Sequence, residues 1–205
     1  TNGETNPYGL GVDIPSFSAI FNDPNEGDSG EYYHIQVNTE ADFSGEMMWD
    51  SEKSEMLSTV QGLRSPQISY AGETLVSDIT YYWRIRFWDN HGAQSPWSNV
   101  GNFLLDLIPP TGSITVNGGD EYTTIRDVDL TIVGEDEITE VAEMSVCNTN
   151  TFEDCTWEEY VTEKSWSLTS GDGLKRVYAR FKDDAGNKSV IYNRSITLDT
   201  TAPVG

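Results

Sequence analysis

Residues 81–88 read Tyr-Tyr-Trp-Arg-Ile-Arg-Phe-Trp, and their alternation indicates a β-strand. Because successive side chains of a strand point to opposite faces, one set of four is predicted to face a core. That inward set is Tyr81, Trp83, Ile85 and Phe87. The outward set is Tyr82, Arg84, Arg86 and Trp88. Arginine stems can lie over aromatic rings on such an outer face, so the strand is expected to be half-buried in a sheet.

The rest of the chain shows short strands and no pattern typical of a long helix. Residues 177–181 repeat the alternation and direct Val177, Ala179 and Phe181 inward. Short apolar runs are bounded by Gly, Asn, Asp and Pro, which is typical of a sandwich built from many short strands. The sequence therefore predicts an all-β fold.

Internal repetition divides the chain into two domains. Residues 87–95 align without gaps with residues 181–189 through the pattern Phe-x-Asp-Asn/Asp-x-Gly-x-x-Ser. This pattern indicates a strand that enters a tight turn, where Asp and Asn bond backbone N–H groups and Gly permits a positive φ. Residues 105–112 and 198–205 share a second pattern, in which Leu-Asp leads into a Pro-bearing junction and then a Gly.

These repeats predict four segments. An N-terminal extension covers residues 1–6, a first sandwich 7–105, a second sandwich 106–199, and a linker or the start of a following repeat 200–205. Domains of about 100 residues suit this division. Prolines at the junctions stiffen the links, so we expect an extended arrangement of domains cut from a longer array.

The charge balance excludes several classes of function. The 205 residues carry 12 Lys plus Arg against 34 Asp plus Glu, a formal net charge of −22. Such a chain repels nucleic-acid backbones and anionic lipid, and no run of 18 apolar residues predicts a membrane span. No nucleophile elbow, zinc-protease motif or phosphate-binding loop occurs. The sequence therefore predicts a protein that is not an enzyme, with no catalytic residue, no nucleic-acid partner and no membrane insertion.

The two cysteines, Cys147 and Cys155, close a loop of nine residues. Their spacing is not the Cys-x-x-Cys of a redox-active pair, and partners for a zinc site are lacking. We predict a structural disulfide that pins a hairpin and an oxidising compartment for the protein.

The first domain resembles a fibronectin type III-like domain of bacterial and archaeal extracellular proteins. The resemblance is carried by residues 31–37, 48–51, 80–89 and 95–98. Similar sandwich modules accompany glycoside hydrolases, including those that precede the catalytic barrel of bacterial rhamnosidases. The resemblance implies a β-sandwich with Tyr81 as its corner tyrosine. It implies less about function, because such modules serve as spacers, adhesive units and accessory domains alike.

The second domain resembles a bacterial Ig-like repeat found in tandem in surface proteins. The carrying segments are residues 110–119, 166–168, 171–173, 181–187 and 198–203. The cysteine segment 147–155 departs from that pattern. Together, the two resemblances imply two tandem Ig-like or fibronectin type III-like β-sandwiches.

Acidic residues crowd the start of the second domain and the two junctions, and they are candidates for a structural calcium site. The candidate ligands are Asp106, Asp199, Asp127, Asp129 and Asp136. Calcium takes six to eight hard oxygens, which gathered carboxylates can supply. The alternative is a solvated acidic face with no ion, which is the commoner meaning of a run of like charges.

Trp88 and Trp97 are the candidate ligand-binding residues, because flat aromatic rings stack on the apolar faces of sugars. The alternative is that both rings serve packing alone. Trp97 follows Ser95-Pro96 and can lie across the strand pair, while Arg86 can cover Trp88.

Two classes of function follow from this sequence. The favoured hypothesis is a non-enzymatic spacer or adhesive module of a larger protein, extracellular or on the cell surface. Its partners would be neighbouring domains of the same chain, with a cell-surface glycan or protein as a further candidate. The alternative is an accessory, carbohydrate-associated part of a secreted glycoside hydrolase. A filament protomer, with residues 1–10 as a donor segment, is a third hypothesis.

Overall fold

The computed structural model describes residues 1 and 3–204 and divides the chain into two units, Thr1–Leu107 and Ile108–Gly205. The division falls two residues after the predicted boundary, just before Pro109 and Pro110. The predicted extension and the predicted linker include Asn2 and Gly205, and these two residues lie outside the described part of the chain.

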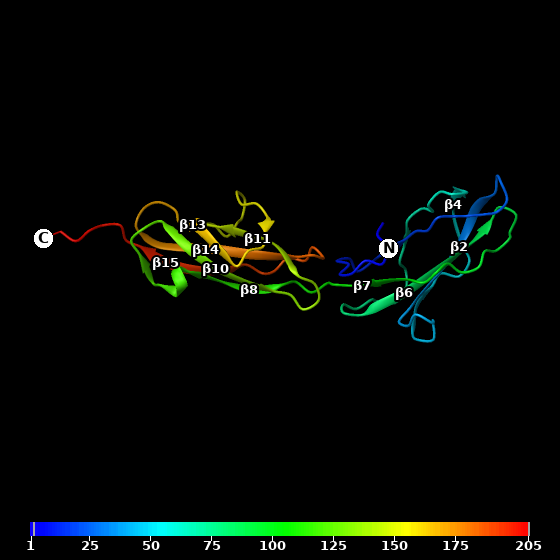
Figure 1. The fold of residues 1–205 in the computed structure, drawn as a ribbon, viewed down its shortest axis with the longest axis horizontal. Helices are drawn as coiled ribbons and strands as arrows, with labels where there is room; N and C mark the ends of the chain where they lie inside the picture. The colour runs from blue at the N-terminus through cyan, green and yellow to red at the C-terminus, as the bar shows by residue number, and fades with distance from the viewer. Residues whose placement is uncertain (2, 205) are drawn as a thin grey trace. The chain divides into compact units, whose positions relative to one another are not determined.

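Unit 1, Thr1–Leu107, is a sandwich of one large and one small antiparallel sheet (Figure 1). Its strands are β1 (Ser16–Phe17), β2 (Ser29–Asn38), β3 (Met47–Asp50), β4 (Ser54–Val60), β5 (Ile68–Ser69), β6 (Thr80–Asp89) and β7 (Gly101–Leu104). The large sheet has the order β3-β2-β6-β7, with β4 also paired to β2, and β1 pairs with β5.

The core of unit 1 is built from the inward faces of β2, β6 and β7. Ile35 lies opposite Ile85, and both are about fully buried. The predicted corner residue, Tyr81, is 1% exposed, and its hydroxyl accepts a hydrogen bond of 2.9 Å from the Val76 N–H. Trp83 was predicted to face inward and is half-buried, packed against this core at its edge.

Residues 6–10 pair with the last strand of unit 1, and the predicted division into an extension over residues 1–6 and a sandwich from residue 7 stays a prediction. Leu104 donates its N–H to Pro7 O at 3.1 Å, and Leu10 donates to Leu104 O at 2.8 Å. Asn6 Oδ1 accepts the N–H of Asn102 at 3.0 Å. Residues 6–10 thus complete the edge beside β7 within their own unit, and this contact removes the basis for treating 1–10 as a free donor segment.

Unit 2, Ile108–Gly205, is a sandwich of a three-stranded and a five-stranded sheet (Figure 1). Its strands are β8 (Thr111–Val116), β9 (Tyr122–Thr123), β10 (Asp127–Glu135), β11 (Val141–Cys147), β12 (Glu158–Glu159), β13 (Glu163–Ser167), β14 (Gly173–Asp183) and β15 (Tyr192–Leu198). A single 3-10 turn, η1 (Asn117–Gly119), follows β8. The sheet orders are β13-β10-β8 and β12-β11-β14-β15-β9.

The core of unit 2 lies between these sheets, and β14 supplies its centre. Val177, Ala179 and Phe181 are each 0% exposed, as their alternation predicts. Trp166 lies on β13. Its ring is only half-buried and packs against the border of the core. Its indole N–H donates to Asn148 Oδ1 at 3.0 Å, which satisfies the polar end of the ring.

The repeated motif forms the same turn in both units. In unit 1, Ala93 and His91 donate their N–H groups to Asp89 Oδ1, both at 2.8 Å. In unit 2, Asn187 donates its N–H to Asp183 Oδ1 at 2.8 Å. The glycines take the positive φ that the turn requires, 86° at Gly92 and 92° at Gly186. The serines of the motif, Ser95 and Ser189, accept the N–H of the preceding strand's Phe at 3.0 and 2.9 Å.

The all-β fold class is therefore confirmed, with two sandwiches in sequence along the chain. The extended arrangement of the two units stays a prediction. Among the residues that the structure describes, no helix has the length and apolar character needed to cross a membrane.

Candidate functional site

A network of polar side chains covers the outer face of the large sheet of unit 1. Strand register brings the residues together, because Gln36 on β2 pairs with Asp50 on β3 and with Arg84 on β6. Two residues earlier on β2, His34 pairs with Arg86 on β6. Residues two apart share a face of a strand, so these five side chains point to the same side of the sheet. The large-sheet core lies on the opposite side.

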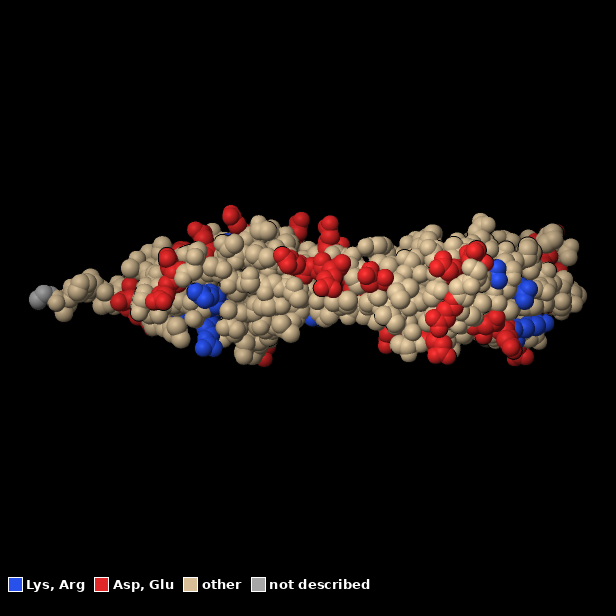
Figure 2. Space-filling view, turned by 90° about the horizontal axis from the view of Figure 1, so that it is seen from below, with Lys and Arg blue, Asp and Glu red and all other residues tan. Residues whose placement is uncertain are grey.

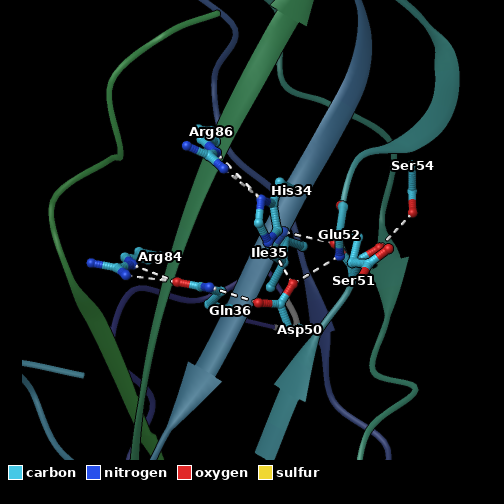
Figure 3. Close-up of polar contacts among 9 residues, drawn as sticks. All are labelled: His34, Ile35, Gln36, Asp50, Ser51, Glu52, Ser54, Arg84 and Arg86. Carbon is cyan, nitrogen blue, oxygen red and sulfur yellow. Dashed lines mark hydrogen bonds and ion pairs between the residues drawn. The ribbon is translucent and has the colours of Figure 1, made fainter. Parts of the chain in front are cut away.

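Hydrogen bonds link the five side chains into one chain (Figure 3). Arg84 donates from Nε and Nη2 to Gln36 Oε1 at 3.0 and 2.7 Å. Gln36 Nε2 donates to Asp50 Oδ2 at 2.7 Å, and His34 Nε2 lies 2.6 Å from Asp50 Oδ1. Arg86 Nη2 lies 3.0 Å from His34 Nδ1.

This chain of bonds sets the proton on His34. A guanidinium can only donate, so Nδ1 of His34 accepts from Arg86. The imidazole then carries its proton on Nε2 and donates it to the carboxylate of Asp50. Both ring nitrogens of His34 thus have a hydrogen-bond partner.

Asp50 anchors the network at the end of β3. Partial burial alone would raise the pKa of its carboxyl, but hydrogen bonds from Gln36, from the Glu52 N–H and from His34 outweigh this and lower the pKa below its ordinary value. The turn that follows is held by Ser51, whose hydroxyl accepts the Ile35 N–H at 2.8 Å. Local backbone bonds thus position the carboxylate.

Aromatic rings alternate with the cations on this face. Arg84 lies 3.9 Å from the ring centroid of Phe43 and 4.5 Å from that of Trp97. Arg86 lies 4.3 Å from Trp97 and 5.2 Å from Trp88. A third cation lies at the end of this row: Lys53 Nζ is 5.0 Å from the Trp88 ring and 4.3 Å from the Tyr32 ring. These distances lie within the range of cation–π attraction.

Residues 95–98 bring Trp97 to this row of rings and cations. No pattern in the sequence directly predicts its contact with the arginines. Ser95 and Ser98 donate their N–H groups to Phe87 O and Ile85 O at 2.9 and 2.8 Å, so the segment runs beside β6. Trp97 projects between them onto the outer face, with its ring 4.8 Å from the His34 ring. The contact joins positions that are far apart in sequence.

The two predicted ligand-binding residues, Trp88 and Trp97, therefore share one face of unit 1. Each ring contacts at least one guanidinium, which is the packing alternative raised from the sequence. Both side chains remain half-buried and not enclosed in the core. Sugar binding by these rings stays a prediction.

The structure places the five predicted calcium ligands in both units. Asp106 belongs to unit 1, whereas the other four belong to unit 2. Asp127 and Asp129 lie on β10 and accept hydrogen bonds from the hydroxyls of Ser167 and Ser165 on β13. In the described part of the chain, neither these two nor Asp199 belongs to a group of three or more ligand atoms lying within 4.8 Å of one another.

The remaining predicted ligands have local roles in unit 2. Asp136 accepts the N–H groups of Ile138 and Thr139 at 3.0 and 2.8 Å, and so shapes the turn after β10. Asp199 accepts the N–H of Thr201 at 3.1 Å. Calcium binding by any of these residues stays a prediction.

One acidic group was missed by sequence reasoning. Asp28, Asp89 and His91 each offer a ligand atom within 4.8 Å of the others, and His91 Nδ1 lies 3.3 Å from Asp28 Oδ1. Two members lie in the repeated turn, but Asp28 is distant in sequence, so only strand pairing reveals the group. Asp89 already serves the turn through Oδ1.

Cys147 and Cys155 are joined by a disulfide in unit 2. The loop that they close carries Phe152, which is 4% exposed, and Trp157 follows it. Arg180 on β14 lies 4.3 Å from the Phe152 ring and 4.6 Å from the Trp157 ring. The loop thus lays aromatic rings on the outer face of β14.

Comparison with known families identifies the class of this chain. Residues 1–108 match the family model described as the Rha78A-like, N-terminal immunoglobulin domain. The match covers more than half of the chain, so the chain belongs to this family. The resemblance of the first domain to the sandwich modules that accompany rhamnosidases is confirmed.

The curated relatives are bacterial enzymes named α-L-rhamnosidase. The protein from Alteromonas sp. (strain LOR) is 34% identical over 113 residues, and one from Formosa agariphila is 30% identical over 110 residues. Each alignment covers 52% of this chain and 11% of the relative. The chain thus matches about a tenth of the length of these relatives.

Two solved structures align with most of this chain at low identity. The fibronectin(III)-like modules of Clostridium thermocellum CbhA align with a TM-score of 0.48 at 10% identity, covering 95% of this chain and 89% of theirs. The α-L-rhamnosidase of Dictyoglumus thermophilum aligns with a TM-score of 0.44 at 14% identity, covering 95% of this chain and 28% of that one.

Proposed function

We propose that this chain is a non-catalytic, accessory part of a secreted glycoside hydrolase of the α-L-rhamnosidase type. The family match over residues 1–108 carries the proposal. The relatives named α-L-rhamnosidase support it, because they align with about half of this chain and extend far beyond the aligned part. Catalysis would belong to regions of the enzyme that this chain does not contain.

The alternative raised from the sequence is thus better supported than the favoured hypothesis of a spacer or adhesive module. In both hypotheses the chain has no catalytic role. They differ in the neighbouring parts of the protein to which the chain is joined. An accessory domain would have neighbouring domains of the same enzyme as its partners, whereas a spacer would hold a binding head away from a surface. The rhamnosidase relatives favour the former.

Secretion is part of the proposal. The disulfide between Cys147 and Cys155 suits an oxidising compartment, since thiols remain reduced in the cytosol. The excess of acidic residues favours solubility outside the cell. Reduction by dithiothreitol should therefore destabilise unit 2.

The experiment sequences the gene on both sides of the region that encodes these 205 residues, and it assays two proteins on an aryl α-L-rhamnoside. The full gene product is expected to release the aryl group, and the 205-residue chain is expected to release none. Removing residues 1–107 from the full product should lower its thermal stability or its activity on a polymeric substrate. A 205-residue chain that hydrolyses the substrate alone, or a gene without a catalytic domain, would overturn the proposal.

A further inference from the structure

The cations of unit 1 are concentrated on one face. Residues 1–107 contain four Lys and Arg against sixteen Asp and Glu, and the four are Lys53, Arg64, Arg84 and Arg86. Three of these four lie in the row of rings on the outer face of the large sheet. On the face that Figure 2 draws, the red carboxylates outnumber the blue cations. The outer face of the large sheet thus holds most of the unit's few cations, together with the Asp50 carboxylate.

These three cations have no carboxylate partner within ion-pair distance among the described residues. Arg84 and Arg86 bond neutral groups, Gln36 and His34. The Gln94 side-chain amide faces the guanidinium of Arg86. Nη1 of Arg84 receives no partner from the described residues, so this guanidinium retains a free donor edge on the outer face.

The two arginines also oppose each other electrostatically. Burial lowers the pKa of Arg84, the charge of Arg86 lowers it further, and Asp50 offsets only part of the shift. Two like charges held side by side cost free energy unless an anion approaches them. A bound carboxylate would relieve this repulsion and occupy the free edge of Arg84.

The equivalent face of unit 2 differs in this respect. Arg180 and Lys182 occupy the positions of Arg86 and Trp88 in the repeat, and they also lie against an aromatic ring, that of Trp157. However, Lys182 is paired there with the Glu143 carboxylate on β11. In unit 1, the Asp50 carboxylate on this face is bonded by Gln36 and His34, and neither arginine is paired with it directly. The arginines of unit 1 can therefore accept an external anion.

We propose that the outer face of unit 1 binds a carboxylated saccharide, with Arg84 as the carboxylate-binding residue and Trp97 as the ring on which the sugar stacks. The planar fork of a guanidinium matches a carboxylate, and a flat indole matches the apolar face of a pyranose. The choice of a saccharide rests on the proposed function, because the enzyme that this domain would accompany acts on carbohydrate. The charges call for an anion, and the planar fork of Arg84 favours a carboxylate.

The net charge limits the size of this ligand. A long polyanion would be repelled by a protein of charge −22. At physiological ionic strength, charges farther away than about 8 Å are largely screened, so a short oligosaccharide with few carboxylates experiences mainly the local cations. The expected ligand is therefore a short acidic oligosaccharide.

Isothermal titration calorimetry of the 205-residue chain with trigalacturonate tests this inference, with maltotriose as the neutral probe. The wild type is expected to bind trigalacturonate at least tenfold more tightly than maltotriose. Arg84→Gln should weaken trigalacturonate binding at least tenfold. Arg64→Gln is the matched control, because it removes the same charge from unit 1 at a residue whose guanidinium bonds Ser18, outside the row.

A second variant guards against loss of folding. Arg84→Lys keeps the charge and loses the fork, so it should bind trigalacturonate less tightly than the wild type and more tightly than Arg84→Gln. Equal affinity for the two sugars, equal losses in Arg84→Gln and Arg64→Gln, or tighter binding of a sulfated trisaccharide would overturn the inference. Absence of binding would do so as well. None of these outcomes affects the test of the proposed function, which reads the gene and its hydrolase activity.

Discussion

The two units share one turn and differ in the face beside it. After β6 and after β14, an Asp accepts backbone N–H groups, a Gly takes a positive φ, and a Ser bonds back to the strand. Outside that turn, β6 directs Arg84, Arg86 and Trp88 outward into a row of rings and cations. Strand β14 directs Arg180 and Lys182 under a disulfide-closed loop.

This comparison shows which positions a sandwich repeat holds constant. The turn bonds pair backbone N–H groups with the Asp carboxylate and the Ser hydroxyl, so their loss would destabilise either unit. The outward-facing side chains of β6 and β14 are not needed for these turn bonds. They can therefore serve binding in one unit and packing in the other. Substitutions in the two turns should therefore have similar effects on stability, whereas substitutions on the two outer faces should differ.

The largest effect is expected from the core residue that precedes each turn. Phe181→Ala and Phe87→Ala should each lower the free energy of unfolding of their own unit by about 3–5 kcal/mol, because a large buried ring is removed. Hydrogen exchange followed by mass spectrometry reports each unit separately. Protection should fall in the mutated unit only, and Phe181→Leu should give a smaller loss. Equal loss of protection in both units would show that their cores are not separate.

Removal of the disulfide should affect unit 2 alone. The double variant Cys147→Ser and Cys155→Ser is expected to lose about 2.5 kcal/mol, the chain-entropy value for a loop this short. Differential scanning calorimetry of the oxidised protein, the reduced protein and the variant measures the change. The variant should no longer respond to dithiothreitol. An unchanged melting profile would mean that the ring contacts hold the loop without the bond.

Alanine at the two turn glycines should have equal effects in the two units. Gly92→Ala and Gly186→Ala each place a Cβ at a positive φ, which costs about 1–2 kcal/mol. No heavy atom lies within 4 Å of either added Cβ, so the cost comes from the backbone alone. Urea unfolding gives both values, with the Gly→Asn variants as controls that tolerate this φ better. A difference of more than a factor of two between them would contradict the equivalence of the turns.

Acid should weaken the turn of unit 1 through Asp89. Burial raises the pKa of this carboxyl, but the N–H groups of Ala93, His91 and Gly92 outweigh burial and lower it below the ordinary value of about 3.9. A lowered folded-state pKa means that the stabilisation is present above that ordinary value and is lost as pH falls through the folded-state pKa. Carboxyl chemical shifts recorded against pH measure it. Asp89→Asn should remove this contribution, whereas Asp13→Asn, an exposed control, should leave it unchanged.

Removal of divalent cations is expected to have the smallest effect. The predicted ligands Asp127 and Asp129 bond serine hydroxyls, and no assembled set of oxygens surrounds them in the described part of unit 2. EDTA should therefore shift the melting temperature of either unit by less than about 2 °C. A larger fall confined to unit 2 would establish the calcium site predicted from its acids. One confined to unit 1 would point to the group of Asp28, Asp89 and His91.

Local periodicity predicted the parts of the fold that depend on neighbouring residues. The alternation over 81–88 placed Tyr81, Ile85 and Phe87 in the core and Arg84 and Arg86 outside it. The repeated motif predicted both turns, because Asp and Gly act on backbone groups within four residues.

Contacts between distant segments could not be predicted in this way. The bond between His34 and Asp50 requires the register of β2 with β3, and a shift of one residue would place them on opposite faces. Trp97 reaches the arginines only because the two serines beside it pair with β6. The docking of residues 6–10 on β7 is likewise set by partners more than ninety positions away.

The pairing of residues 6–10 with β7 determines when the sandwich of unit 1 can be completed during synthesis. The backbone of Pro7 and Leu10 is made first, yet its partner, Leu104, emerges almost a hundred residues later. At ribosomal speeds of about 5–20 residues per second, the leading segment waits roughly 5–20 seconds for its place. A nascent chain that stalls before residue 104 therefore leaves residues 6–10 without their partner strand. Any shortened version intended to fold alone has to retain both ends of this pairing.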